Sequence, residues 1–148
     1  MIKKILFVCT GNTCRSPMAE LILKEKIKLA GIKGVRVSSA GLSADEGAKI
    51  SKNSFTALKM LGYKPYGFKS KQLTMDMINK SSVVLCMTEE HKYYLQNFKN
   101  VFTISEWAGV EEVIDPYGKD LNAYVKTSHI LEDACNKILE KLIKSEEK

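Results

Sequence analysis

A cysteine, an arginine and a serine stand close together near the start of the chain, in the segment Cys9-Thr-Gly-Asn-Thr-Cys-Arg15 followed by Ser16. Backbone N–H groups that curl around a short loop, together with the N-terminus of a following helix, form a concave site for a tetrahedral oxyanion. Arg15 would add a planar, charged donor fork to that site. The same positive field would stabilise a thiolate at Cys9, so the spacing predicts a nucleophile directly beneath a bound phosphorus atom.

The residues around this loop support the same chemistry. A cysteine and an arginine separated by five residues would arise by chance in roughly one such chain in twenty, so the flanking residues matter. Residues 5–8 are an apolar run typical of a strand buried on both faces. Gly11 permits a tight path, and Asn12 tolerates left-handed backbone geometry. Ser16 and Pro17 are typical of an N-cap and a first helical position.

Strands and helices are predicted to alternate along the rest of the chain. Apolar runs and alternation predict strands over residues 2–9, 35–39, 83–86 and 101–104, and helical spacing predicts helices over 17–30, 51–61, 88–98 and 121–142 with a short one starting at 74. This order predicts an α/β fold with an open parallel sheet covered by helices on both faces. Ligands bind such sheets beyond the carboxyl ends of the strands, where the loops around Cys9 and Asp115 could meet.

Length and composition predict an ordinary globular domain. The chain has 148 residues, of which 45% are hydrophobic and 27% charged, so we expect one domain over residues 1–148. The apolar run near the start is too short for a signal peptide, and no stretch of about 18 apolar residues could span a membrane. We therefore expect a cytoplasmic protein that makes no membrane contact.

The number of cysteines and the net charge indicate which metals, cofactors and partners the protein could bind. The four cysteines should be reduced thiols in the cytoplasm, and none has the spacing of a zinc site, so we expect no metal and no cofactor. A net charge of +6 favours anionic partners. The lysines are interspersed with apolar and acidic residues, which favours a solvated surface and no nucleic-acid partner. The two arginines, Arg15 and Arg36, are the candidates for bidentate phosphate recognition.

The segment from Cys9 to Pro17 resembles the signature loop of the low-molecular-weight protein tyrosine phosphatases. The resemblance continues through Ser39-Ala-Gly41, residues 85–88 (Leu-Cys-Met-Thr) and Asp115-Pro-Tyr117, so it covers nearly the whole chain. It implies a flavodoxin-like sheet of four parallel strands, with the phosphate-binding loop after the first. It also implies phosphorylated proteins as partners, a cysteinyl-phosphate intermediate, and inorganic phosphate as product and competitive ligand.

The resemblance also implies roles for single residues. Cys9 resembles the nucleophile, Arg15 the phosphate clamp, and Asp115 the general acid that later activates a water molecule. Taken alone, Asp115-Pro116 is more often a turn, and its pairing with the Cys9 loop is what favours catalysis. Phosphate or substrate contacts are expected from Thr10, Gly11, Asn12, Thr13, Cys14, Ser16 and Tyr117, with Asn12 holding the loop in shape and Ser16 bonded to the thiolate.

Two positions of the loop leave alternatives open. The phosphotyrosine-directed members of the family usually have an aliphatic residue where this chain has Thr13, whereas a threonine resembles the bacterial protein-arginine phosphatases. A hydroxyl can pair with the N–H groups of a phosphorylated guanidinium, so Thr13 favours phosphoarginine over phosphotyrosine, unless it turns inward to a backbone group. Cys14 is either a small buried thiol or the partner of a reversible disulfide with Cys9.

Other functions use related loops. A thioredoxin-coupled arsenate reductase needs two further cysteines; Cys86 is suggestively placed, but residues 88–94 contain no cysteine and Cys135 is expected to face the core. A binding module that holds phosphate without hydrolysis would not need both Arg15 and Asp115. We expect His91 and His129 at the surface or at helix ends rather than in catalysis.

Overall fold

Four short strands form one parallel sheet in the computed structural model, which describes residues 2–146. β1 (Lys4–Cys9) pairs with β2 (Arg36–Gly41) on one side and with β3 (Val83–Cys86) on the other, and β4 (Val101–Thr103) forms the far edge. Because Cys9 pairs with Gly41 and Val8 with Cys86, three strands end at the same edge of the sheet.

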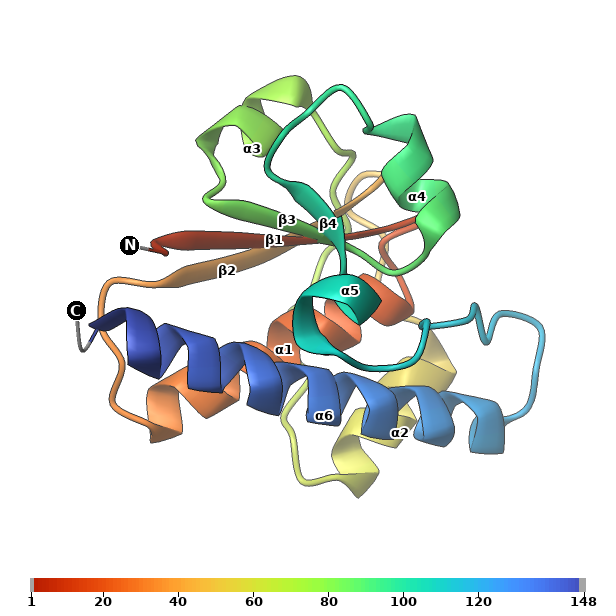
Figure 1. Ribbon diagram of the computed structural model, residues 1–148. Coiled ribbons are helices and arrows are strands. Elements are labelled where there is room, and N and C mark those ends of the chain that lie inside the picture. The colour runs from red at the N-terminus through yellow and green to blue at the C-terminus, as the bar shows by residue number, and fades with distance from the viewer. Residues whose placement is uncertain (1, 147–148) are drawn as a thin grey trace.

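Helices cover both faces of this sheet (Figure 1). The helices on one side are α1 (Arg15–Leu29), α2 (Lys52–Met60), α5 (Ile104–Ala108) and α6 (Leu121–Glu146). The helices on the other side are α3 (Met75–Lys80) and α4 (Glu89–Tyr94). The predicted α/β architecture, a flavodoxin-like open sheet of four parallel strands with a loop after the first strand, is confirmed.

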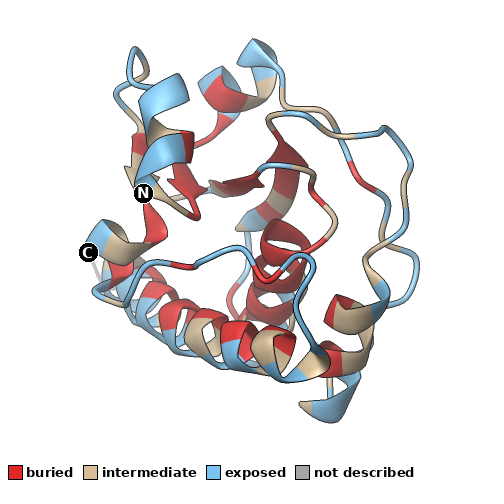
Figure 2. Cartoon of the chain, turned by 90° about the vertical axis from the view of Figure 1, so that its right-hand side faces the viewer, coloured by how far each residue is buried: buried red, intermediate tan, exposed pale blue. Residues whose placement is uncertain are grey.

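Side chains of β1 divide between two hydrophobic clusters. Phe7 and Cys9 point into the larger cluster, which α1, α5 and α6 complete. Val8 and Cys86 belong to the smaller cluster on the other face. Figure 2 shows buried residues in red along the strands and on the inner faces of the helices. The alternation of β1 places Val8 and Cys9 on opposite faces of the sheet, and Cys86, which pairs with Val8, lies on the face opposite to Cys9.

Several predicted boundaries differ from the structure, among them the start of β1 at Lys4 and the end of β2 at Gly41. α1 begins at Arg15 with Cys14 as N-cap, so Ser16 is a residue of the helix and not its cap. α4 ends at Tyr94 instead of near residue 98, because the chain turns there and packs Leu95 into the smaller cluster. α5 was not predicted; it has only five residues and depends on a capping box between Thr103 and Glu106.

None of the helices within residues 2–146 combines the length and apolar character needed to cross a lipid bilayer.

Candidate active site

The loop between β1 and α1 follows a tightly constrained path. Asn12 has a left-handed backbone, with φ of 56°, as the sequence indicated. Gly11 needs no such conformation, and a Cβ placed on it would meet Thr13 Oγ1 at an ordinary 3.7 Å. The position that requires a glycine is Gly41, because a Cβ there would lie only 2.6 Å from Thr10 O. The tight approach expected at Gly11 is therefore between the loop and β2.

A chain of hydrogen bonds runs beneath the loop to the candidate nucleophile. Ser16 Oγ lies 2.8 Å from Cys9 Sγ, and Asn12 Nδ2 donates to Ser16 Oγ over 2.8 Å. Because Ser16 Oγ accepts from the amide of Asn12, its own proton is available to the sulfur. The arrangement therefore presents a hydrogen-bond donor to Cys9 Sγ at the end of β1.

Asn12 connects this chain to the rest of the fold. Its Nδ2 also donates to Ser39 Oγ over 2.9 Å, and its Oδ1 accepts from Lys71 N over 2.8 Å. Ser39 Oγ in turn donates to Glu20 Oε1 over 2.7 Å. Asn12 and Ser39 are fully or almost fully buried. The side chain of Asn12 thus fixes the loop against β2, α1 and the segment before α3, with every polar atom of its amide bonded.

Arg15 is buried at the start of α1 with one side of its guanidinium held in place. Nη1 donates to Val113 O over 3.0 Å, while Nη2 lies 3.6 Å from Asp115 Oδ2. Nε is buried and has no hydrogen-bond partner among residues 2–146. Nε and Nη2 are the parallel donor pair that matches two oxygens of one oxyanion. An unpaired buried donor of this kind is costly unless a ligand binds it.

The N-terminus of α1 is also open to an anion. Its N-cap residue, Cys14, makes no side-chain capping bond, and its first turn contains no acidic residue. The first N–H groups of a helix carry a partial positive charge that such caps usually satisfy. The loop, the helix end and Arg15 together form a cationic site of the size of a phosphate group.

The loop that carries Asp115 is anchored beside β3. Val113 N donates to Met87 O over 3.3 Å, and the side chain of Val113 is fully buried. Asp115 Oδ1 accepts from Tyr117 N over 3.0 Å, which fixes the carboxyl group within its turn. The side chain of Asp115 is 50% exposed, so one oxygen faces Arg15 while the group remains accessible to solvent.

One pocket of about 250 Å³ brings the two separate sequence segments together. Its lining residues are Cys9, Thr10, Gly11, Thr13, Cys14, Arg15, Asp115 and Tyr117. Asn12 and Ser16, the other two candidate site residues, lie behind the loop and support it. Thr13 is partly exposed and its hydroxyl bonds no backbone group among the described residues, so it does not turn inward. Tyr117 is 78% exposed at the mouth of the pocket.

His91 lies in the last turn of α4, which is one of the two places expected for it, but it is buried and not at the surface; His129 is exposed as expected. His91 is 5% exposed and its Nε2 lies 2.9 Å from Thr10 Oγ1, so it supports the loop from α4. Burial lowers the pKa of His91 from 6.5 to about 4, and the nearby Arg15 acts in the same direction. The residue is therefore neutral at neutral pH. The helix predicted over residues 88–98 was the only sequence signal for the place of His91, and it says nothing of the contact between His91 and the loop.

The other cysteines differ in their surroundings. Cys14 lines the pocket and its Sγ lies 3.9 Å from Tyr124 Oη. Cys86 is fully buried in β3, and burial raises its pKa to about 12. Cys135 faces the core, as expected, with its pKa raised by burial. Neither Cys86 nor Cys135 lines the pocket, so the structure gives no support to a disulfide relay of the reductase type.

No cluster of three or more His, Cys, Asp or Glu side chains able to hold a metal ion occurs within residues 2–146.

The family model described as "Low molecular weight phosphotyrosine protein phosphatase" matches residues 4–148. The chain belongs to this family. It is therefore a protein phosphatase, and the resemblance noted in the sequence is confirmed over almost the whole chain.

The similar proteins are named for two different activities, protein-arginine phosphatase and protein-tyrosine phosphatase. The protein-arginine-phosphatase of Geobacillus stearothermophilus is 36% identical over 94% of this chain and 95% of its own length, and its structure gives a TM-score of 0.88. The low molecular weight protein-tyrosine-phosphatase PtpB of Staphylococcus epidermidis is 35% identical over 91% of this chain and 96% of its own. The low molecular weight protein tyrosine phosphatase of T. tengcongensis is 39% identical over 93% and 98% of the two chains, with a TM-score of 0.87.

Proposed function

We propose that this phosphatase hydrolyses a phosphorylated protein side chain through a cysteinyl-phosphate intermediate. The observation that carries the proposal is the single pocket that Cys9, Arg15 and Asp115 line together. In it, Cys9 is the nucleophile, Arg15 binds two phosphoryl oxygens through Nε and Nη2, and Asp115 transfers protons. Ser16 donates to the thiolate, and Asn12 holds the loop.

The reaction proceeds in two displacements at phosphorus. Cys9 Sγ attacks, the bond from phosphorus to the side chain breaks, and Asp115 gives its proton to the departing oxygen or nitrogen. Water then attacks the cysteinyl phosphate while Asp115 takes a proton from it. The S–P bond breaks, inorganic phosphate leaves, and the Cys9 thiolate and the protonated Asp115 are restored. Phosphate, as the product, competes with substrate for the same donors.

We further propose phosphoarginine as the preferred substrate. Thr13 lines the pocket and is partly exposed, with its Oγ1 3.9 Å from Cys14 Sγ. The guanidinium of phosphoarginine carries several N–H groups, which can donate hydrogen bonds to the Thr13 hydroxyl and to the exposed carboxyl group of Asp115. The ring of phosphotyrosine carries no such donors and would offer the hydroxyl of Thr13 no hydrogen bond. The residue after Tyr117 is Gly118, which adds no side chain to the wall of the pocket. The relatives include both a protein-arginine-phosphatase and a protein-tyrosine-phosphatase, so their names are consistent with either substrate. Phosphotyrosine is the alternative.

Side-by-side kcat/KM values on phosphoarginine and phosphotyrosine peptides of the same sequence test both proposals, with Cys9→Ser as the blank. We expect phosphoarginine to be preferred, and Thr13→Ile to shift the ratio toward phosphotyrosine by about tenfold or more. An unchanged ratio in Thr13→Ile would remove Thr13 as the selecting residue. If the folded wild-type protein showed no Cys9-dependent turnover of either peptide, the proposed hydrolysis would be contradicted, and the pocket would be a site that binds phosphate without hydrolysing it.

The cellular setting is also a proposal. We infer a cytoplasmic location, where phosphorylated proteins are the partners, because all four cysteines are free thiols, as a reducing compartment maintains them. A reversible disulfide between Cys9 and Cys14 stays a prediction, which mass spectrometry of the peroxide-treated protein can test. Cell fractionation tests the location.

A further inference from the structure

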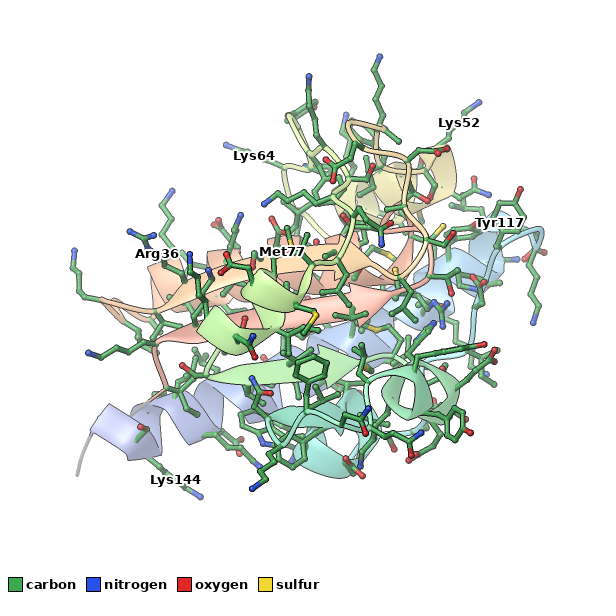
Figure 3. The ribbon with its side chains drawn as sticks, turned by 90° about the horizontal axis from the view of Figure 1, so that it is seen from above. Arg36, Lys52, Lys64, Met77, Tyr117 and Lys144 are labelled. Atoms are coloured by element: carbon green, nitrogen blue, oxygen red, sulfur yellow. The ribbon has the colours of Figure 1, made fainter. Side chains whose placement is uncertain are left out.

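A second cavity, of about 450 Å³, is lined by residues of β1, β2, α1 and the segment 71–77. We call it the β2 cavity. None of its lining residues lines the active-site pocket. Figure 3 shows Arg36 of the β2 cavity and Tyr117 of the active-site pocket toward opposite ends of the molecule. The β2 cavity is therefore separate from the candidate active site.

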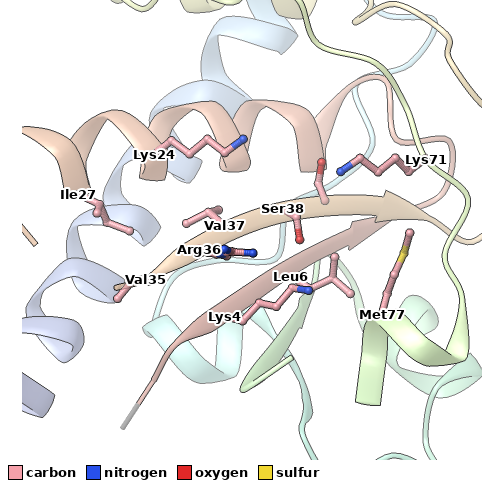
Figure 4. Close-up of a pocket in the computed structure, with 11 residues that line it drawn as sticks. Lys4, Leu6, Lys24, Ile27, Val35, Arg36, Val37, Ser38, Lys71 and Met77 are labelled. Atoms are coloured by element: carbon pink, nitrogen blue, oxygen red, sulfur yellow. The ribbon is translucent and has the colours of Figure 1, made fainter. Parts of the chain in front are cut away.

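The lining of the β2 cavity is strongly cationic. Among the described residues that line it, four are lysine or arginine and none is aspartate or glutamate. Figure 4 shows Lys24 and Lys71 pointing toward one another along β2. For Lys4, Arg36 and Lys71, no carboxylate oxygen within residues 2–146 lies within 4.0 Å. Three cations are thus available to an anionic ligand.

Lys24 carries the fourth positive charge and connects the β2 cavity to a buried carboxylate. Its Nζ lies 2.7 Å from Glu20 Oε2, and the side chain of Glu20 is 8% exposed. An ammonium group has three N–H donors, so Lys24 can keep Glu20 as its partner and still donate to a ligand. An anion in the β2 cavity would therefore share Lys24 with Glu20.

Hydrogen bonds continue from this ion pair to the phosphate-binding loop. Glu20 Oε1 accepts from Ser39 Oγ, which in turn accepts from Asn12 Nδ2. Lys71, another residue that lines the β2 cavity, donates its backbone N–H to Asn12 Oδ1. Asn12 also donates to Ser16 Oγ, which lies against the candidate nucleophile. The β2 cavity and the candidate active site thus share one hydrogen-bond network, with the side chain of Asn12 at its centre.

We propose that the β2 cavity is a second anion site, which binds a small anion with two or more linked phosphate groups, and that binding there is transmitted to Asn12. Three unpaired cations and Lys24 complement the several negative charges of such an anion. The cavity is also larger than the active-site pocket of about 250 Å³. Single-stranded nucleic acid fits less well, because no aromatic residue among the described ones lines the cavity for base stacking.

Isothermal titration calorimetry with tripolyphosphate tests the site on the wild-type protein. The titration is done in saturating inorganic phosphate, so that the active-site pocket is occupied and the result does not depend on the proposed catalysis. We expect one tripolyphosphate per chain, with an affinity that falls as salt is raised. A parallel titration with ATP shows whether an organic group attached to the phosphates adds affinity through the apolar part of the lining. Absence of binding by both compounds would overturn the proposal.

Substitution of two unpaired cations locates the site. The double variant of Lys4→Gln and Arg36→Gln should weaken tripolyphosphate binding by about tenfold or more. The matched control is the double variant of Lys52→Gln and Lys144→Gln, which removes the same charge at exposed positions. Figure 3 shows both control residues away from Met77 of the β2 cavity. The control should change the Kd by less than about twofold, and equal losses in the two double variants would overturn the assignment to the cavity.

Nuclear magnetic resonance of the side-chain amide of Asn12 tests the connection to the loop and needs no variant. In the same phosphate-saturated protein, tripolyphosphate should shift the two Nδ2 proton resonances of Asn12 with the Kd found by calorimetry. Binding without any shift at Asn12 would overturn the connection. Ser39→Ala interrupts the path between Glu20 and Asn12, so it should reduce the shift. A shift of full size in Ser39→Ala would overturn the path through Glu20.

Discussion

His91 Nε2 lies 2.9 Å from Thr10 Oγ1 and so joins α4 to the phosphate-binding loop. On the other side of the ring, Thr88 Oγ1 lies 3.2 Å from Nδ1 and also accepts from the backbone N–H of His91. The hydroxyl proton of Thr88 is therefore available to Nδ1, which leaves Nε2 as the N–H donor to Thr10. A neutral histidine in this tautomer positions the first residue of the loop.

The stability of the protein should therefore depend on pH through His91. Burial lowers its pKa to about 4 in the folded protein, against 6.5 when unfolded. Between these values the unfolded chain binds more protons, so stability is retained above about pH 6.5 and falls as the pH drops toward 4. The loss amounts to at most about 3 kcal/mol. Urea unfolding at several pH values measures it.

The two histidines provide a matched comparison for this pH dependence. His91→Asn should reduce the loss of stability between pH 6.5 and 4 while lowering stability at neutral pH by about 1–3 kcal/mol, since the contact with Thr10 is lost. His129→Asn, at an exposed position of α6, should keep the wild-type profile. Equal profiles for both variants would show that His91 is not the titrating group responsible.

Gly41→Ala should damage the active site from β2. The added Cβ would lie 2.6 Å from Thr10 O and 2.9 Å from Asn12 N, both backbone atoms of the loop. The loop would have to shift, so we expect a loss of about 1–3 kcal/mol in stability and a larger relative loss in kcat/KM. Gly11→Ala, whose Cβ has room, should keep wild-type thermal stability. Similar melting temperatures for the two variants would contradict the assignment of the tight approach to Gly41.

The elements with local signals could be predicted from the sequence, because their caps and periodicity lie within each element. The helices predicted to start at residues 51 and 74 are present with Ser51 and Thr74 as their N-caps, and β3 has the predicted bounds. The start of α1 could not be predicted correctly, because Ser16 has the residue type of a cap but bonds to Cys9 instead. α5 was missed because it is too short to show periodicity.

The residues of the candidate site also fall into a group that could be predicted from the sequence and a group that could not. The loop residues were recognisable because they are contiguous, and Asp115 through its resemblance to the family. Ser39, Glu20 and Val113 reach the loop through tertiary contacts. Ser39 belongs to a segment that resembles the family, but the sequence did not indicate its contact with Asn12, and nothing in the spacing or type of Glu20 and Val113 points to the site. The sequence therefore identified the groups that would contact phosphate, while most of the residues that hold those groups became evident only in the fold.

Arg15→Lys should abolish stabilisation by inorganic phosphate. At about a hundredfold excess over its Kd, phosphate should stabilise the wild-type protein by about 3 kcal/mol, which raises Tm. A single ammonium group cannot bond to Val113 O and also supply two parallel donors to phosphate. The control is Arg36→Lys, at the other arginine, which is exposed on β2 and should keep the full shift. A phosphate-induced Tm shift that survives in Arg15→Lys would contradict the assignment of Nε and Nη2 to the anion.

Asp115→Asn should slow the release of the leaving group more than it weakens binding. The carboxyl group lies beside Arg15 at the mouth of the pocket, where an amide of the same shape can fill its place but cannot donate or accept the proton at low cost. We expect kcat to fall by about 10²–10⁴ on a peptide substrate, and by less on p-nitrophenyl phosphate, whose leaving group needs little protonation. Glu111→Gln, an exposed carboxyl group of the same loop, is the control and should keep wild-type kcat. An equal loss on both substrates would mean that Asp115 acts through Arg15, by orienting the guanidinium, and not as the acid itself.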